Sequence, residues 1–85
     1  MEEIADWRDK IDEIDVQLVT LINERARCAI EIGKIKKQNN MEIFNPDREQ
    51  QVFTNIFQHN TGPVSDNAFL KLFKQIITTC RNLEK

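Results

Sequence analysis

Two basic residues stand where a helical pattern predicts packed, apolar side chains. Arg25 falls within an apolar seam of three- and four-residue spacing, and Lys36 follows eleven residues later on nearly the same helix face. A buried guanidinium without an anionic partner is energetically unfavourable. Either a glutamate of a neighbouring helix or a ligand could supply that anion. Two long cationic side chains roughly 16 Å apart along the axis could hold a small dianion between them.

Gly33 lies between these two cations, inside a long helical segment, where glycine destabilises a helix by roughly 1 kcal/mol relative to alanine. A glycine at this position would be explained if another group approached the helix backbone closely. That group could be a neighbouring helix or a ligand. Lys36 taken alone would also be ordinary as a solvated lysine near a helix end, because cations suit the negative end of the helix dipole.

Charged residues at the ends of two further predicted helices add to this pattern. Glu49 suits the first turn of a helix, but Arg48 beside it opposes the helix dipole. Cys80 and Glu84 share one face near a helix C-terminus, where an acidic side chain is unfavourable. Together with the arginine in the seam, these placements indicate a shared site that offsets their costs.

The first of the elements that position these residues is a helix predicted from about Glu2 to Asn39. A seam of this kind is typical of a long helix packed along its length against other helices. The helix would be roughly 55 Å long, whereas a compact domain of 85 residues has a radius of gyration of about 12 Å. A second copy of the chain is therefore predicted to cover it. The seam comprises Ile4, Trp7, Ile11, Ile14, Leu18, Leu21, Arg25, Cys28, Ile32 and Ile35.

Two shorter helices are predicted after the long one. Asn45 and Pro46 are typical of a helix start, and glycine and proline at positions 62 and 63 end that helix after His59. Ser65 can cap a third helix, whose apolar positions again follow the helical period. The sequence therefore predicts an all-α fold of three helices, one very long, in a single domain over residues 1–85.

Composition limits the remaining possibilities. A monomer of 85 residues buries so little surface that its stability would be marginal. Two cysteines fifty-two residues apart and one histidine argue against a disulfide or a metal site as the source of further stability. The net charge of −2 argues against a nonspecific nucleic-acid binder. Apolar runs never exceed three residues, so we expect no membrane span. We expect a cytoplasmic location.

Cys28 and Cys80 are expected to be reduced core or near-core residues.

Five stretches of the chain, in their order and spacing, resemble the all-helical (type II) chorismate mutase family. The resemblance implies an intertwined homodimer and an isomerase that rearranges chorismate to prephenate in the shikimate pathway of aromatic amino-acid biosynthesis. Such a reaction within one substrate molecule requires no nucleophile, general base, metal or cofactor. The matching stretches are Trp7–Asp15, Leu21–Arg25, Glu31–Lys36, Asn45–Glu49 and Phe73–Arg81.

The resemblance also assigns roles to residues. Arg25 matches a cation that binds a substrate carboxylate, and Lys36 matches one that reaches a carboxylate and the ether oxygen of the breaking bond. Arg48 matches an arginine near the site, and Glu49 an acid that accepts a hydrogen bond from the substrate hydroxyl. Arg8 matches an arginine donated by the other protomer. Independently, Arg8 and Lys36 would be about 42 Å apart on one straight helix, too far to share a small ligand within one chain.

Three positions depart from the family pattern. Asn45 stands where many members have aspartate, near the hydroxyl end of the substrate, and still allows helix capping. Cys80 stands where many have serine, so a hydroxyl hydrogen bond would become a weak thiol contact. Glu84 stands where many have glutamine, the second donor to the ether oxygen, and must be protonated to donate.

The catalytic tasks implied by the resemblance are to hold the reactive conformer and to stabilise negative charge on the ether oxygen. Ile32, Val52 and Ile77 are expected to form apolar walls around the charges. One alternative is a catalytically weak or silent helical dimerisation or regulatory module of a shikimate-pathway enzyme. Another is an unrelated coiled-coil adaptor, in which Arg25 would be paired within the protein.

Overall fold

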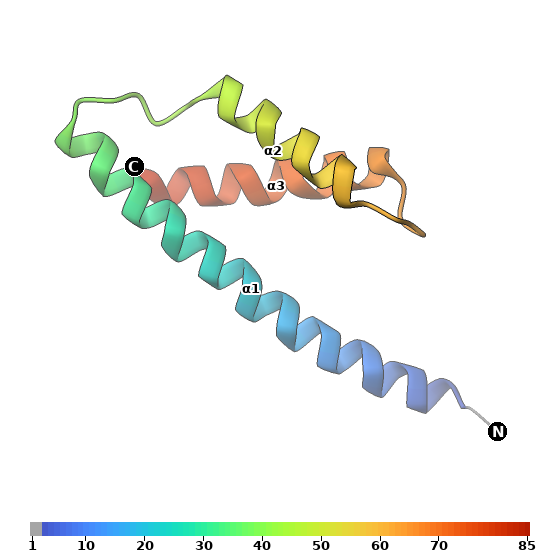
Figure 1. The fold of residues 1–85 in the computed structure, drawn as a ribbon. Coiled ribbons are helices and arrows are strands. Elements are labelled where there is room, and N and C mark those ends of the chain that lie inside the picture. The colour runs from blue at the N-terminus through green and yellow to red at the C-terminus, as the bar shows by residue number, and fades with distance from the viewer. Residues whose placement is uncertain (1–2) are drawn as a thin grey trace.

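The computed structural model describes residues 3–85, and within them the chain forms three α-helices and no strand (Figure 1). They are α1 (Ile4–Gln38), α2 (Pro46–His59) and α3 (Asp66–Glu84). The all-α prediction is therefore confirmed. The expected start of the first helix at Glu2 lies outside the described residues, and α1 ends one residue before the predicted Asn39.

Local sequence explains where α1 starts and stops. The Glu3 backbone N–H donates to Asp6 Oδ2 at 3.2 Å, which satisfies one of the donors left over at a helix N-terminus. At the other end, the Asn39 side-chain amide donates to the Ile35 carbonyl at 2.8 Å. Asn40 then takes a left-handed conformation with φ 54°, which turns the chain out of the helix.

The predicted caps of the two shorter helices are confirmed. Asn45 Oδ1 accepts a hydrogen bond from the Arg48 backbone N–H at 3.1 Å, and Pro46 occupies the first position of α2. Ser65 Oγ accepts from the Ala68 backbone N–H at 3.1 Å at the start of α3. Short side chains next to their own backbone thus set both helix starts, as helix-capping chemistry predicts.

Helix α3 joins the other two helices. It packs against both α1 and α2, which are not packed directly against each other within residues 3–85. Helices α2 and α3 lie over the C-terminal half of α1, while its N-terminal half extends away from them (Figure 1). The resulting shape is elongated, with extents of 59 × 22 × 16 Å.

Gly33 marks the crossing of α1 and α3. A Cβ atom added there would lie 2.6 Å from the carbonyl oxygen and 2.7 Å from the Cα atom of Glu84. These are backbone atoms, so the helices would have to separate to admit any side chain. The sequence left open whether a neighbouring helix or a ligand approaches Gly33. The structure shows the neighbouring helix α3 there.

The single chain buries little of its apolar surface. Only Ala29, Ile77 and Cys80 are buried among the hydrophobic residues of 3–85. The prediction that Cys80 is a core residue is confirmed, whereas the same prediction for Cys28 is wrong for one chain, because Cys28 is exposed there. The seam residues of the N-terminal half of α1 are 49–69% exposed, namely Ile4, Trp7, Ile11, Ile14, Leu18 and Leu21.

None of the helices described over residues 3–85 combines the length and the apolar character needed to cross a lipid bilayer.

Candidate functional site

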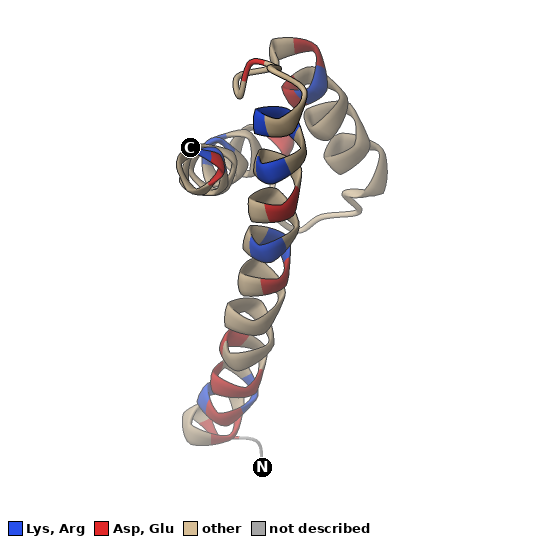
Figure 2. Cartoon of the chain, turned by 90° about the vertical axis from the view of Figure 1, so that its left-hand side faces the viewer, with Lys and Arg blue, Asp and Glu red and all other residues tan. Residues whose placement is uncertain are grey.

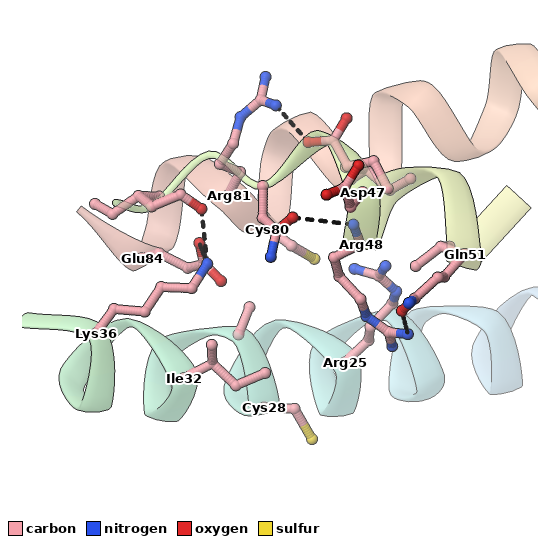
Figure 3. Close-up of a pocket in the computed structure, with 16 residues that line it drawn as sticks. Arg25, Cys28, Ile32, Lys36, Asp47, Arg48, Gln51, Cys80, Arg81 and Glu84 are labelled. Atoms are coloured by element: carbon pink, nitrogen blue, oxygen red, sulfur yellow. Dashed lines mark hydrogen bonds and ion pairs between the residues drawn. The ribbon is translucent and has the colours of Figure 1, made fainter. Parts of the chain in front are cut away.

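A cleft of about 570 Å³ opens between the C-terminal half of α1, the start of α2 and the end of α3 (Figure 3). The structure brings seven of the eight predicted site residues into its lining, and the three predicted apolar walls, Ile32, Val52 and Ile77, line it as well. The seven are Arg25, Lys36, Asn45, Arg48, Glu49, Cys80 and Glu84.

The eighth residue, Arg8, does not line the cleft. It lies on the exposed N-terminal half of α1, roughly 25 Å along the helix from Arg25 by the rise per residue. Figure 2, which looks along α3 from its C-terminal end, shows basic residues in both halves of α1. Those that line the cleft, Arg25 and Lys36, belong to the C-terminal half. Within one chain, therefore, Arg8 and the cleft are separate.

Lys36 is held by protein atoms at one end of the cleft. Its ammonium donates to the Ile43 carbonyl at 2.7 Å and lies 3.4 Å from Glu84 Oε2. The two side chains are only 14% and 10% exposed, so Lys36 is not a solvated lysine. An ammonium has three N–H donors, and these two contacts leave one for a ligand. Lys36 is thus oriented before any ligand binds.

Glu84 reaches this position because Gly33 lets the end of α3 approach α1 closely. Its carboxylate faces the Lys36 ammonium across the cleft (Figure 3). An ionised carboxylate only accepts hydrogen bonds, and it becomes a donor only when protonated. The pair therefore offers a ligand oxygen one donor when Glu84 is ionised and two when it is protonated.

Two arginines occupy the other end of the cleft. Figure 3 shows the heads of Arg25 and Arg48 near each other, with the Arg48 Nη1 atom 3.4 Å from Gln51 Oε1. Neither guanidinium lies within 4.0 Å of a carboxylate oxygen in residues 3–85. Within the described residues, therefore, no glutamate of a neighbouring helix forms the ion pair with Arg25 that the sequence left open. These two cations are open to a ligand with an anionic group.

Glu49 forms an ion pair that the sequence did not predict. Its Oε2 atom accepts from Arg81 Nη1 at 2.6 Å, and the two side chains are 27% and 28% exposed. Arg81 also lies over the ring of Phe44, with its central carbon 4.8 Å from the ring centroid. The only sequence signal for Arg81 was its position four residues after Ile77 on the face that lines the cleft. A cation in the last turn of a helix is otherwise ordinary.

The remaining predicted residues differ in how they face the cleft. Asn45 uses its carbonyl oxygen as the helix cap, which leaves its side-chain N–H donors for other partners. Cys80 is 3% exposed, and its thiol is at most a weak donor. The sulfur of Cys28 points away from the cleft (Figure 3), although other atoms of that residue line it.

In the part of the chain that the structure describes, no three side chains of His, Cys, Asp or Glu gather closely enough to hold a metal ion. The cleft is lined by four cationic and three acidic side chains, with aliphatic side chains between them. Apolar walls exclude water and so strengthen the interaction of these charges with a ligand. The arrangement suits a small molecule with anionic groups and a hydroxyl.

Comparisons with known proteins point to one family. Residues 7–85 match the family model described as chorismate mutase type II. The bifunctional chorismate mutase/prephenate dehydratase of Aquifex aeolicus is 38% identical over 89 residues, covering 100% of this chain and 25% of the relative. The chain thus spans about a quarter of the bifunctional relatives it matches. The chorismate mutase of Methanocaldococcus jannaschii is 35% identical over 89 residues, covering 100% of this chain and 87% of the relative.

Solved structures show the same fold. Chorismate mutase (form II) from Thermus thermophilus superposes with a TM-score of 0.94 at 30% identity, covering 98% of this chain and 94% of that chain. Chorismate mutase from Helicobacter pylori, solved in complex with prephenate, gives a TM-score of 0.87 at 22% identity, covering 95% of this chain and 88% of that chain. The second likeness concerns the fold alone.

Proposed function

Because the chain belongs to the chorismate mutase type II family, we propose that it catalyses the rearrangement of chorismate to prephenate, a step of aromatic amino-acid biosynthesis. The observation that carries the proposal is the division of the cleft into two cationic ends. Two arginines without a carboxylate partner in residues 3–85 lie at one end, and a lysine fixed by Glu84 and a backbone carbonyl lies at the other. Apolar side chains separate the two ends. We further propose that residues 1–85 act as a single domain.

The arginine end binds and orients the substrate. Arg25 holds one carboxylate of the dianion through its planar fork of N–H donors, which matches a carboxylate better than a lysine would. Arg48 adds a second positive charge at the same end. Holding a flexible molecule in its compact, reactive conformer lowers the entropic part of the barrier.

The lysine end stabilises the charge that develops during the reaction. As the carbon–oxygen bond breaks, electron density grows on the ether oxygen. Lys36 directs its one remaining N–H donor at that oxygen, and its positive charge also attracts a substrate carboxylate nearby. Ile43 and Glu84 already hold the ammonium in this position. A charge fixed in advance needs no reorganisation in the transition state, which is the usual source of large electrostatic rate effects.

The departures from the family pattern have defined consequences in this proposal. Glu84 assists Lys36 as a second donor to the ether oxygen only when it is protonated. Asn45 turns its side-chain N–H donors toward the hydroxyl end of the substrate, where Glu49 accepts a hydrogen bond from the hydroxyl group. Cys80 contributes a weak thiol contact to a carboxylate, so its effect on affinity is small.

A complete site requires a second copy of the chain. Arg8 lies too far along α1 to reach the cleft of its own chain, and the apolar residues around it are about half exposed. An antiparallel partner helix on this surface would bring Arg8 of one protomer to the cleft of the other, and two-fold symmetry then gives two equivalent sites. Arg8 would bind the second carboxylate and complete the charge that a dianion needs.

The ultraviolet absorbance of chorismate tests the proposal directly. Purified protein is expected to consume chorismate with saturation kinetics and to form prephenate stoichiometrically. Failure to do so, by a chain that is folded and dimeric, would contradict the proposal. That result would support the alternative of a silent dimerisation or regulatory module, for which the departures from the family pattern at Asn45, Cys80 and Glu84 are the argument.

A further inference from the structure

Arg81 links two elements that carry the cleft. It lies in the last turn of α3, and its Nη1 atom donates to Oε2 of Glu49, in the first turn of α2, at 2.6 Å. The two residues are 32 positions apart in the chain. A hydrogen bond between a guanidinium and a carboxylate at this distance is short and charge-assisted, and therefore directional.

The surroundings of Arg81 commit it to this role. Its guanidinium lies 4.8 Å from the centroid of the Phe44 ring, where the face of the ring attracts a cation. Phe44 belongs to the loop that leads into α2. Arg81 is thus held by an acid and by an aromatic ring, whereas Arg25 and Arg48 have no carboxylate partner in residues 3–85.

The pairing leaves one oxygen of Glu49 for another partner. Oε2 accepts from Arg81, while Oε1 has no hydrogen-bond partner among the described residues, and Glu49 lines the cleft. Since α2 is not packed on α1 within those residues, its placement over the cleft depends on contacts with α3. Arg81 supplies a polar contact between α2 and α3 at the level of the site.

We propose that Arg81 is a positioning residue, which holds the Glu49 carboxylate so that Oε1 faces the cleft and accepts the hydrogen bond of the substrate hydroxyl. The proposal rests on the proposed function, and it assigns Arg81 no contact with the substrate. It also explains why an acid can line a cleft for a dianion, because Arg81 neutralises the charge that Glu49 brings.

A purely structural role makes a different prediction. A cation in the last turn of α3 and an acid in the first turn of α2 both suit their helix dipoles, and an ion pair more than a quarter exposed adds little stability. In that case removing Arg81 would change the unfolding free energy and leave the kcat/KM of the folded protein unchanged. If Arg81 acts through Glu49, its removal should matter only while Glu49 is present.

A double-mutant cycle measured by kcat/KM for chorismate separates the two roles. Arg81→Met is expected to lower kcat/KM about tenfold, the usual scale for losing one charge-assisted contact. In the Glu49→Ala background, the same Arg81→Met change is expected to alter kcat/KM less than about twofold. Arg81→Lys should stay within about threefold of the wild type, because an ammonium also supplies the single N–H donor of the observed contact and is also attracted by the face of the Phe44 ring.

Controls make each outcome decisive. Lys74→Met removes an exposed cation of α3 that does not line the cleft, and it should leave kcat/KM unchanged. Denaturant unfolding and the oligomeric state are measured for every variant. If Arg81→Met does not fold, Arg81→Gln replaces it in the cycle. An undiminished loss from the Arg81 change in the Glu49→Ala background would overturn the positioning role.

Binding of prephenate, measured by calorimetric titration, distinguishes failure of this inference from failure of the proposed function. A wild-type chain without turnover contradicts the proposed function, and the cycle is then read from the dissociation constants for prephenate. Weaker binding on removal of Arg81 only in the presence of Glu49 supports the positioning role. An equal effect in both backgrounds, or none, contradicts it.

Discussion

The two ends of the cleft present their cations in different ways. At one end, Lys36 is 14% exposed and is already bound by Glu84 and by the Ile43 carbonyl. At the other end, Arg25 and Arg48 find no carboxylate in residues 3–85. A cation fixed in advance is suited to stabilise a charge that appears only in the transition state, whereas unpartnered arginines are suited to bind charge that the substrate already carries.

The largest effect should come from the fixed end. Lys36→Ala is expected to lower kcat/KM by about 10³-fold, mainly through kcat, because it removes the donor aimed at the developing oxyanion. Stopped-flow or steady-state absorbance assays measure the loss. Near-normal turnover by this variant would contradict the electrostatic role of Lys36 and remove the distinction between the two ends.

Two further variants separate chemistry from folding at this position. Lys37→Ala removes a neighbouring exposed cation that does not line the cleft and should leave turnover unchanged. Lys36→Ala leaves the Glu84 carboxylate largely buried without its partner, which can cost about 3 kcal/mol of unfolding free energy. The double variant Lys36→Ala/Glu84→Gln should regain much of that stability without regaining activity.

The arginine end should give a smaller effect of another kind. Arg25→Ala is expected to raise KM about 30-fold with a lesser change in kcat, because it removes binding that substrate and transition state share. The KM of the wild type should also rise with salt, since salt screens cations that solvent reaches, and Arg25 is half-buried while Arg48 is exposed. Arg27→Ala, two residues away and outside the cleft lining, is the matched control. A loss confined to kcat would show that this end does more than bind.

The sequence predicted the elements better than the contacts between them. The starts of α2 and α3 were predictable because Asn45 and Ser65 cap their helices through atoms only three residues away. The pairing of Arg81 with Glu49 spans 32 residues and depends on how two helices pack, which no local pattern encodes. The core position predicted for Cys28 was wrong for one chain. The seam identifies residues that share one face of the helix, but it does not show how far along that face the other helices of the same chain reach.

The site itself was predictable to a similar extent. Residues that break a local rule, such as Arg25 in an apolar seam and Gly33 inside a helix, indicated where something else must approach. The structure gives the two cases different answers. At Gly33 the approaching group is the backbone of Glu84, whereas Arg25 lines the cleft and lies within 4.0 Å of no carboxylate oxygen in residues 3–85. Composition and spacing alone do not separate a packing requirement from a ligand requirement.

The pairing of Lys36 with Glu84 also makes a prediction about the second donor at the fixed end. Glu84→Gln places an amide N–H donor where an ionised carboxylate only accepts, and its side-chain oxygen still accepts from Lys36. The variant is therefore expected to have a kcat several-fold higher than the wild type in the absorbance assay. A lower kcat would mean that the carboxylate serves by orienting Lys36 instead.

The smallest expected effect concerns the two cysteines, which have opposite surroundings. Cys80→Ser places a stronger donor in the cleft lining and is expected to lower KM by about two- to threefold. Because Cys80 is 3% exposed, exchanging its thiol for a hydroxyl should also reduce the unfolding free energy by about 1 kcal/mol. Cys28→Ser is the control, since that sulfur points away from the cleft, and it should leave KM unchanged. Equal responses of KM to both substitutions would mean that Cys80 does not approach the bound substrate, and that the arginine end alone sets its affinity.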